Sequence, residues 1–297
     1  MSEPAKMTVA RLQRKKRSGE KITLLTAYDF PMAKFIDAAG VDVVLVSDAV
    51  GTVGLGRPEA VSVTVEEMVY HTQAVAHGAG AAMVVTTLPF GAYETVEQAV
   101  ATGVRLMKEG HADGVHLEGA VADAPKVKAL VHAGVPVLGH LGVTKQKIVR
   151  TGAIQTQGRT AASATVVVAD ALALANAGAF ALILECIPDR LGEIITRSLE
   201  IPTIGIGAGP GCDGQALVTQ DMLGMFKELS PRFLKVYLDL TQIIVTALTQ
   251  FRTEVEQGQY PGPEHCYAIE DEELGKLLAQ LQDKITQDTR KGGAVHG

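Results

Sequence analysis

The stretch "AMVVTTLPFGAYETVEQAVATGVRLMKEGHADGVHLE", residues 82–118, contains the unit from which we predict the fold. It opens with a short apolar, β-branched run over 82–87 and closes with a second apolar run over 113–118. Between them, Thr95 and Gln98 have the spacing of a capping box, which marks the first turn of a helix. Strands that are apolar on both faces are typical of parallel sheets covered by helices on both sides. The stretch therefore predicts a strand–helix–strand unit with parallel strands.

The same alternation continues through most of the chain. The other strand-like runs are residues 22–27, 42–47, 135–139, 180–185, 202–206 and a less regular one at 215–219. Seven or eight such units fit a (β/α)8 TIM barrel better than a doubly wound sheet. No GxGxxG follows the first run, where a dinucleotide-binding sheet would carry it.

The predicted helices have their own start signals. Thr64 and Glu67 form a second capping box, and Pro188 opens a later helix. The capping box is followed by residues at helical spacing that make one inward stripe: Val65, Met68, Val69, Thr72 and Val75. Pro188 is followed by a second inward stripe: Leu191, Ile194, Ile195 and Leu199. We expect a single barrel domain over 1–297, with an N-terminal helix at 7–18 and a C-terminal helical extension at 232–288. That extension includes a helical pattern over 232–256, and the tail at 290–297 should be disordered.

Composition excludes several classes of protein. The 297 residues are 47% hydrophobic with a formal net charge of -6, so a nucleic-acid partner, which needs a concentrated basic face, is not expected. The one basic run, Arg14 to Arg17, is interpreted as a solvated helix. No apolar stretch approaches a membrane span, and the N-terminus lacks a signal core. Three cysteines without metal-type spacing indicate reduced thiols and a cytoplasmic protein.

Acidic residues end three of the predicted strands. Asp48, Glu118 and Glu185 follow apolar runs, whereas the run at 82–87 ends in Thr86 and Thr87. Barrel enzymes place their chemistry at the carboxyl ends of the strands, so these acids should converge on one mouth. Converging carboxylates can hold a hard divalent cation or remove a proton beside a carbonyl. A strand-end acid can equally cap the next helix or pair with a buried arginine.

Two histidines and two loops are further candidates. His116 lies two residues before Glu118 and should share its side of the strand, while His140 follows the run at 135–139. Each histidine could bind an anion, polarise a carbonyl, ligate a metal, or simply be hydrogen-bonded in the core. The glycine-rich segment 205–214 could bind an anion or form a tight turn, and the long polar segment 144–160 is typical of a lid.

Several stretches together resemble the ketopantoate hydroxymethyltransferase family. The matching stretches run in the family's order over roughly residues 7–267: "LTAYDFPMAKFIDAAGVDVVLVSDAVG", "TVEEMVYHTQAVAHG", "LPFGAY", "GVPVLGHLGVTKQ", "ALALANAGAFALILECIP", "IPTIGIGAGPGCDGQALVTQDMLG" and "YPGPEHCY". The resemblance implies an enzyme of pantothenate biosynthesis that transfers a hydroxymethyl group from 5,10-methylenetetrahydrofolate to 3-methyl-2-oxobutanoate, giving 2-dehydropantoate. It also implies a homo-oligomer, since members of the family are often ring-like decamers.

The resemblance also implies residue roles. In the family a Mg²⁺ ion chelates the oxo acid and acidifies its C3 hydrogen, and the resulting enolate attacks the methylene carbon. Asp48 matches a metal-ligand aspartate, and Glu118 matches an acid near the metal. Glu185 matches the proposed base, and His140 matches the histidine of "G-H-x-G". Asp48, Ala49, Thr87, His116 and His140 would contact the substrate.

This chain departs from the family pattern inside the site. Thr87 stands where the family has a second aspartate ligand, and His116 stands where it has a substrate-binding lysine. Ala49, Ala120 and Lys145 also replace the family's serine, glycine and proline. With a neutral His116, the losses of one carboxylate and one cation largely cancel in formal charge. Thr87 is a poor Mg²⁺ ligand, and the set Asp48, His116 and Glu118 could instead take Mn²⁺ or Zn²⁺.

Three functions therefore remain open from the sequence. The first is an active ketopantoate hydroxymethyltransferase that tolerates its substitutions. The second is a divergent relative that performs related carbon–carbon bond chemistry on another 2-oxo acid. The third is a non-catalytic homologue with a role in assembly or regulation. All three predict the same barrel and differ in what its mouth binds.

Overall fold

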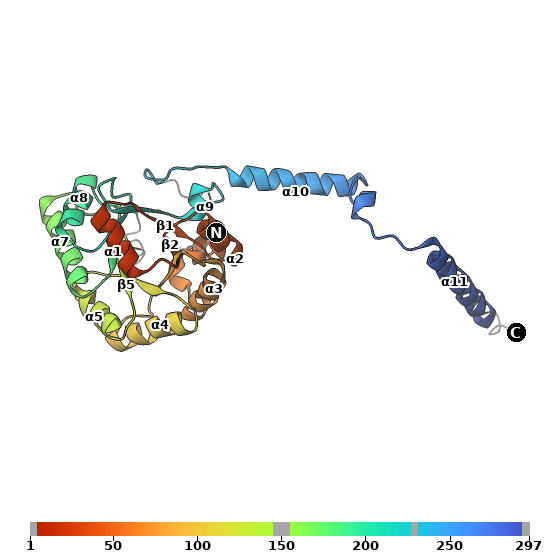
Figure 1. The fold of residues 1–297 in the computed structure, drawn as a ribbon, viewed down its shortest axis with the longest axis horizontal. Helices are drawn as coiled ribbons and strands as arrows, with labels where there is room; N and C mark the ends of the chain where they lie inside the picture. The colour runs from red at the N-terminus through yellow and green to blue at the C-terminus, as the bar shows by residue number, and fades with distance from the viewer. Residues whose placement is uncertain (1–4, 145–154, 227–230, 293–297) are drawn as a thin grey trace. The chain divides into compact units, whose positions relative to one another are not determined.

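A closed barrel of eight parallel strands forms the centre of the protein (Figure 1). The computed structural model describes residues 5–144, 155–226 and 231–292. The strands pair in chain order, and the last closes on the first: β1 Ile22–Thr26, β2 Val43–Val46, β3 Met83–Thr87, β4 Gly114–Glu118, β5 Val137–Gly142, β6 Ala181–Glu185, β7 Thr203–Ile206 and β8 Gly214–Leu217. The predicted (β/α)8 barrel is confirmed.

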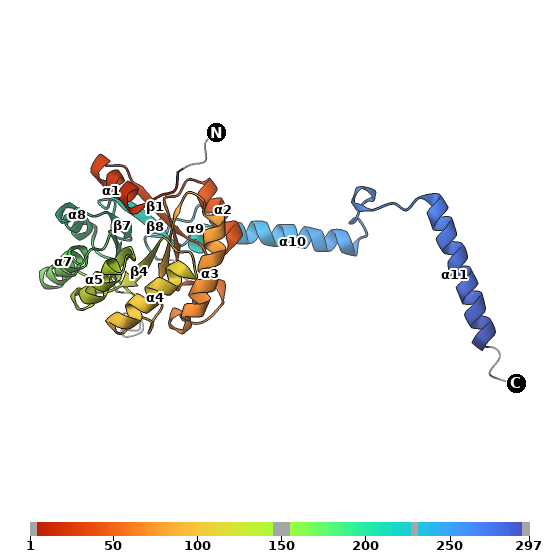
Figure 2. The ribbon, with the colours of Figure 1, turned by 60° about the horizontal axis from the view of Figure 1, so that its bottom comes forward.

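Helices lie around the outside of this barrel (Figure 2). In the described part of the barrel unit the α-helices are α1 Val9–Ser18, α2 Phe30–Ala38, α3 Val65–Gly78, α4 Val96–Lys108, α5 Ala124–His132, α7 Ala161–Asn176, α8 Asp189–Ser198 and α9 Thr219–Met222. A π-helical turn at Val50–Gly54 and 3₁₀ turns at Ala60–Ser62 and Val121–Asp123 complete the loops. Both predicted capping boxes are present, at Thr64 with Glu67 and at Thr95 with Gln98. The start signals in the sequence therefore locate α3 and α4 correctly.

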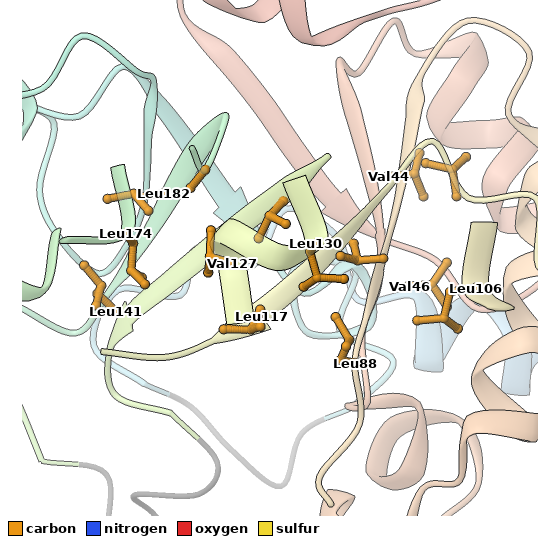
Figure 3. Close-up of a cluster of buried hydrophobic side chains, with 14 of the residues drawn as sticks. Val44, Val46, Leu88, Leu106, Leu117, Val127, Leu130, Leu141, Leu174 and Leu182 are labelled. Carbon is orange, nitrogen blue, oxygen red and sulfur yellow. The ribbon is translucent and has the colours of Figure 1, made fainter. Parts of the chain in front are cut away.

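Alternate residues of each strand face two different apolar layers. Val44 and Val46 of β2 join the cluster between strands and helices, together with Leu117 and Leu130 (Figure 3). Their neighbours Val43 and Leu45 join the cluster inside the barrel. Because side chains alternate along a strand, every second residue of each strand faces the barrel interior. This parity decides which strand-end side chains can reach the mouth.

Helix α1 closes one end of the barrel. Leu12 is fully buried and belongs to the interior cluster. Lys15 Nζ lies 2.7 Å from Asp42 Oδ1, and Lys16 Nζ lies 2.8 Å from Asp213 Oδ2. Both pairs are largely shielded, so the interpretation of the basic run as merely solvated is wrong for these two lysines. They fasten α1 to the segments that precede β2 and β8.

Several boundaries differ from the sequence prediction. Strand β5 runs on to Gly142, so His140 lies within the strand and not after it. Ile194 of α8 is 55% exposed, whereas Leu191 and Ile195 are buried, so the predicted inward stripe is one residue too wide. The helix expected over 232–256 begins only at residue 240.

The remaining part of the chain is a second compact unit, Thr241–Gly297. It contains α10 Leu240–Glu256, which starts at the boundary, a 3₁₀ turn at Pro263–His265, and α11 Asp271–Gly292. Helix α11 extends into the tail that was expected to be disordered, and residues 293–297 lie outside the described residues. One domain over 1–297 with a helical extension at 232–288 stays a prediction. Among the described residues, no helix combines the length and apolar character needed to cross a membrane.

Candidate active site

One cavity of about 1130 Å³ opens at the carboxyl ends of the strands. It brings together most of the residues predicted from the sequence: Asp48, Ala49, His116, Glu118, His140 and Glu185. Thr87 is not among its lining residues, because it is 1% exposed and lies behind His116. Apolar residues of the barrel interior, including Leu24, Leu45 and Ile183, also line the cavity.

Strand parity explains why these polar side chains meet. In β4, the alternate residues Gly114, His116 and Glu118 share one side of the strand. Val115 and Leu117, on the other side, pack in the outer layer. In β6, Ile183 belongs to the interior cluster, so Glu185 two residues later faces the same side. The same alternation that places apolar side chains inside the barrel thus places these polar side chains at the carboxyl ends of the strands.

Four side chains from neighbouring strands form a continuous row of contacts. Thr87 Oγ1 of β3 lies 2.9 Å from His116 Nδ1 of β4. His116 Nε2 lies 3.0 Å from His140 Nδ1 of β5. His140 Nε2 lies 3.0 Å from Glu185 Oε2 of β6. We call these four residues the polar row.

The positions of hydrogen atoms in the polar row are linked. If Glu185 is ionised, electrostatic attraction favours an N–H at His140 Nε2, which lies 3.0 Å from Oε2 although the two atoms are not aligned as a hydrogen bond. Nδ1 of a neutral ring is then an acceptor. His116 then donates from Nε2 to His140, and its own Nδ1 accepts from the Thr87 hydroxyl. This assignment places the hydrogens consistently along the row, with both histidines neutral and a negative charge on Glu185.

The backbone around Glu185 is tightly constrained. Gly142 of the neighbouring strand has φ +99°, and a Cβ there would lie 2.0 Å from the carbonyl oxygen of Glu185. Cys186, next in the chain, has φ 51°, which is uncommon for a residue other than glycine. Its N–H donates to Ile206 O and its carbonyl accepts from Gln157 N. Glycine at 142 and the left-handed turn at 186 together fix the direction in which Glu185 points.

The thiol beside Glu185 is not a nucleophile. Burial, followed by the nearby negative charge of Glu185, raises the pKa of Cys186 to about 11. The thiolate is the reactive form, and at neutral pH this group stays protonated. Cys186 therefore contributes its backbone conformation rather than sulfur chemistry.

Asp48 and Glu118 are the carboxylates that could hold a divalent cation. Both are buried at the cavity wall, at 6% and 9% exposure. A Zn²⁺ site normally takes at least three protein ligands, and the described residues contain no such group of three His, Cys, Asp or Glu side chains. Mg²⁺ is commonly held by one or two carboxylates together with substrate oxygens and water. The donor set thus fits Mg²⁺ better than Zn²⁺.

The structure bears differently on the two candidate loops, the glycine-rich segment 205–214 and the predicted lid at 144–160. In the glycine-rich segment, a Cβ on Gly209 would lie 2.4 Å from the Cβ of Asp189 in α8. Close packing on α8 accounts for a glycine at this position, which favours the tight turn over an anion-binding loop. Of the predicted lid at 144–160, Thr144 and Thr156 line the cavity, and residues 145–154, including Lys145, lie outside the described residues.

Asp221 is a cavity residue that the sequence analysis missed. It lies on α9, just after β8, and burial raises the pKa of its carboxyl to about 6. Its Oδ1 atom is sealed from solvent, and no group in the described parts of the chain donates a hydrogen bond to it. The signal in the sequence is an acid within "LVTQDMLG", directly after the last strand, which could have been added to the strand-end acids.

Comparison with known proteins identifies close relatives. A family model described as ketopantoate hydroxymethyltransferase matches residues 6–263. The 3-methyl-2-oxobutanoate hydroxymethyltransferase of Moorella thermoacetica is 49% identical over 268 residues, which cover 90% of this chain and 100% of that protein. The enzyme of the same name from Nitratidesulfovibrio vulgaris is 46% identical over 280 residues, covering 94% and 91%.

Solved structures of the same architecture are more distant in sequence. Phosphoenolpyruvate phosphomutase from Streptomyces platensis subsp. rosaceus superposes with a TM-score of 0.58 at 14% identity. The match covers 95% of this chain and 98% of that one. At this identity the similarity supports the barrel fold alone.

The contact between Thr87 and His116 can be tested with a matched pair of variants. Thr87→Val keeps the shape but removes the hydroxyl, and loss of a buried hydrogen-bonding partner costs about 1–3 kcal/mol of unfolding free energy. Thr87→Ser keeps the hydroxyl and loses one methyl group, which costs about 1 kcal/mol. Denaturant unfolding should therefore rank Val below Ser. If Thr87→Val were as stable as the wild type, the hydroxyl would make no significant contact.

The buried carboxyl of Asp221 makes a prediction for pH dependence. Its folded-state pKa of about 6 is above the ordinary aspartate value of 3.8, so between these two pH values the folded protein binds a proton that the unfolded protein has released. The resulting stability is present at low pH and is lost as pH rises through about 6. Relative to Asp221→Asn, the unfolding free energy of the wild type should fall by about 1 kcal/mol between pH 5 and pH 7.5. A pH-independent difference between the two proteins would refute the raised pKa.

Proposed function

The chain belongs to the ketopantoate hydroxymethyltransferase family, and we propose that it transfers a hydroxymethyl group from 5,10-methylenetetrahydrofolate to 3-methyl-2-oxobutanoate. The product would be 2-dehydropantoate, in pantothenate biosynthesis. The observation that carries this proposal is the position of Glu185, at the end of the polar row and on the wall of the same cavity as Asp48 and Glu118.

Glu185 is proposed as the base. Its carboxylate takes the proton from C3 of the oxo acid, and the C–H electron pair moves toward the ketone to give the enolate. That carbon then forms the new bond to the methylene carbon, whose two bonds to the folate nitrogens break. Water supplies the hydroxyl oxygen of the product, and the nitrogens take up protons to give tetrahydrofolate. His140 Nε2, 3.0 Å from Oε2, holds the carboxylate in one orientation. Positioning of this kind is a large part of what an enzyme contributes to proton abstraction.

Asp48 and Glu118 are proposed to hold Mg²⁺. When bound, such a cation would withdraw electron density from the oxo acid and make its C3 hydrogen more acidic. Asp48, Ala49, His116 and His140 line the cavity and are proposed to contact the substrate. Thr87, which lies behind His116, would act on the substrate through that histidine and is not proposed as a direct metal ligand.

We further propose that the protein is a cytoplasmic homo-oligomer. Helix α10 carries an apolar stripe at Ile244, Leu248, Phe251 and Val255, each between 39% and 63% exposed. These residues are spaced three and four apart, so they share one helix face. A continuous apolar face of this kind is typical of a surface that another protein chain covers.

Exchange of the C3 hydrogen tests the proposed function. In D₂O with Mg²⁺, the protein should remove the C3 proton signal of 3-methyl-2-oxobutanoate, as followed by proton NMR. Glu185→Gln should slow this exchange by about 10²- to 10⁴-fold, the usual contribution of a general base. Glu193→Gln changes a half-exposed glutamate of α8 that pairs with Arg197 and does not line the cavity; it is the matched control and should exchange at the wild-type rate. Absence of exchange in the wild type would contradict the proposed function, and unchanged exchange in Glu185→Gln would remove Glu185 as the base.

A further inference from the structure

The cavity is larger than the oxo acid requires. Pockets that bury a drug-sized ligand usually measure about 300–1,000 Å³, and this one measures about 1130 Å³. The strand-end acids and histidines occupy the wall formed by β2, β4, β5 and β6. Another part of the lining, from α9 and residues 226 and 231–234, has no part in the chemistry described above and is available to a second, larger molecule.

Asp221 is the acid on that second wall. Helix α9 is fastened to the end of β1, because Thr219 N donates to Thr26 Oγ1 at 3.1 Å and Thr219 Oγ1 donates to Thr26 O at 2.5 Å. These contacts hold the half-buried Asp221 carboxyl at the cavity, with its Oδ1 atom sealed from solvent. A buried acceptor that lacks a donor costs folding free energy, so a ligand that supplies N–H groups would relieve a cost already present.

We propose that Asp221 binds the pterin ring of the one-carbon donor through its N–H groups. This inference rests on the proposed function, because it assumes a reduced folate as the second substrate. A pterin presents a ring N–H and an exocyclic amino group side by side, and a carboxylate accepts two such parallel donors. The terminal torsion of an aspartate is broad and roughly two-fold, so rotation can bring the sealed Oδ1 to the cavity.

Other residues of this wall match the rest of a folate. Phe226 and Phe233 line the cavity and offer aromatic faces for the benzoyl ring. Arg232 also lines it, is exposed, and has no acidic partner in the described part of the chain. A guanidinium in that position suits the carboxylates of the glutamate tail. The wall thus carries an acceptor, apolar rings and a cation, the three chemistries that a folate needs.

Two donors of the same one-carbon unit separate binding of the pterin from the chemistry. With 5,10-methylenetetrahydrofolate, Asp221→Asn should lower kcat/KM for transfer by about 10- to 100-fold, mainly through KM, because an amide cannot accept both N–H groups. With free formaldehyde, which has no pterin, the same variant should lose less than about threefold. Asp189→Asn changes another aspartate on the same cavity and is the matched control with both donors.

Each outcome bears on the proposal. Equal losses with both donors would overturn it and would place Asp221 in the enolisation or in the fold. No loss with the folate would also overturn it. If the wild type failed to exchange the C3 hydrogen, the proposed function would be contradicted, whatever the result for Asp221. Equilibrium dialysis with tetrahydrofolate would still test the role of Asp221. The proposal predicts that Asp221→Asn binds tetrahydrofolate at least about tenfold more weakly than the wild type, and equal binding would overturn it.

Discussion

The contact between His116 and His140 is the interaction on which the account of the site depends. It joins the Thr87–His116 pair to the His140–Glu185 pair, so that side chains of four neighbouring strands act as one unit. The contact exists because the barrel is closed and parallel. Strand register sets Thr87 beside His116 and Gly142 beside Glu185, and parity turns the polar side chains inward. A slip of one residue in any of these strands would break the row.

The polar row also explains how the site accommodates its departures from the family pattern. The resemblance implies a metal-binding aspartate at position 87 and a substrate-binding lysine at position 116, whereas this chain has a hydroxyl and an imidazole in contact there. A buried ion pair carries a large desolvation cost, and removal of one partner alone leaves an uncompensated charge. Exchange of both residues removes one carboxylate and one ammonium group together and leaves a hydrogen-bonded hydroxyl–imidazole pair. With both histidines neutral, the negative charge of the row would lie on Glu185, the proposed base.

Much of this could be predicted from the sequence, and the failures have physical causes. Apolar runs and capping boxes located the strands, α3 and α4, and the strand-end acids located the cavity. The sequence could not place Lys15 and Lys16 in ion pairs, because their partners Asp42 and Asp213 are distant in the chain. It also could not place Thr87 behind His116, since that depends on strand register. Asp221 was missed because α9 is a single short turn without periodicity.

The tautomers of His116 and His140 test the central claim most directly. Nitrogen-15 NMR of histidine-labelled protein at neutral pH, with His116→Asn and His140→Asn used for assignment, reports which ring nitrogen carries the hydrogen. The polar row predicts two neutral rings, both protonated at Nε2, beside an ionised Glu185. If His140 instead carried its hydrogen at Nδ1, its Nε2 lone pair would face the carboxylate, and the row could not hold Glu185 as a base.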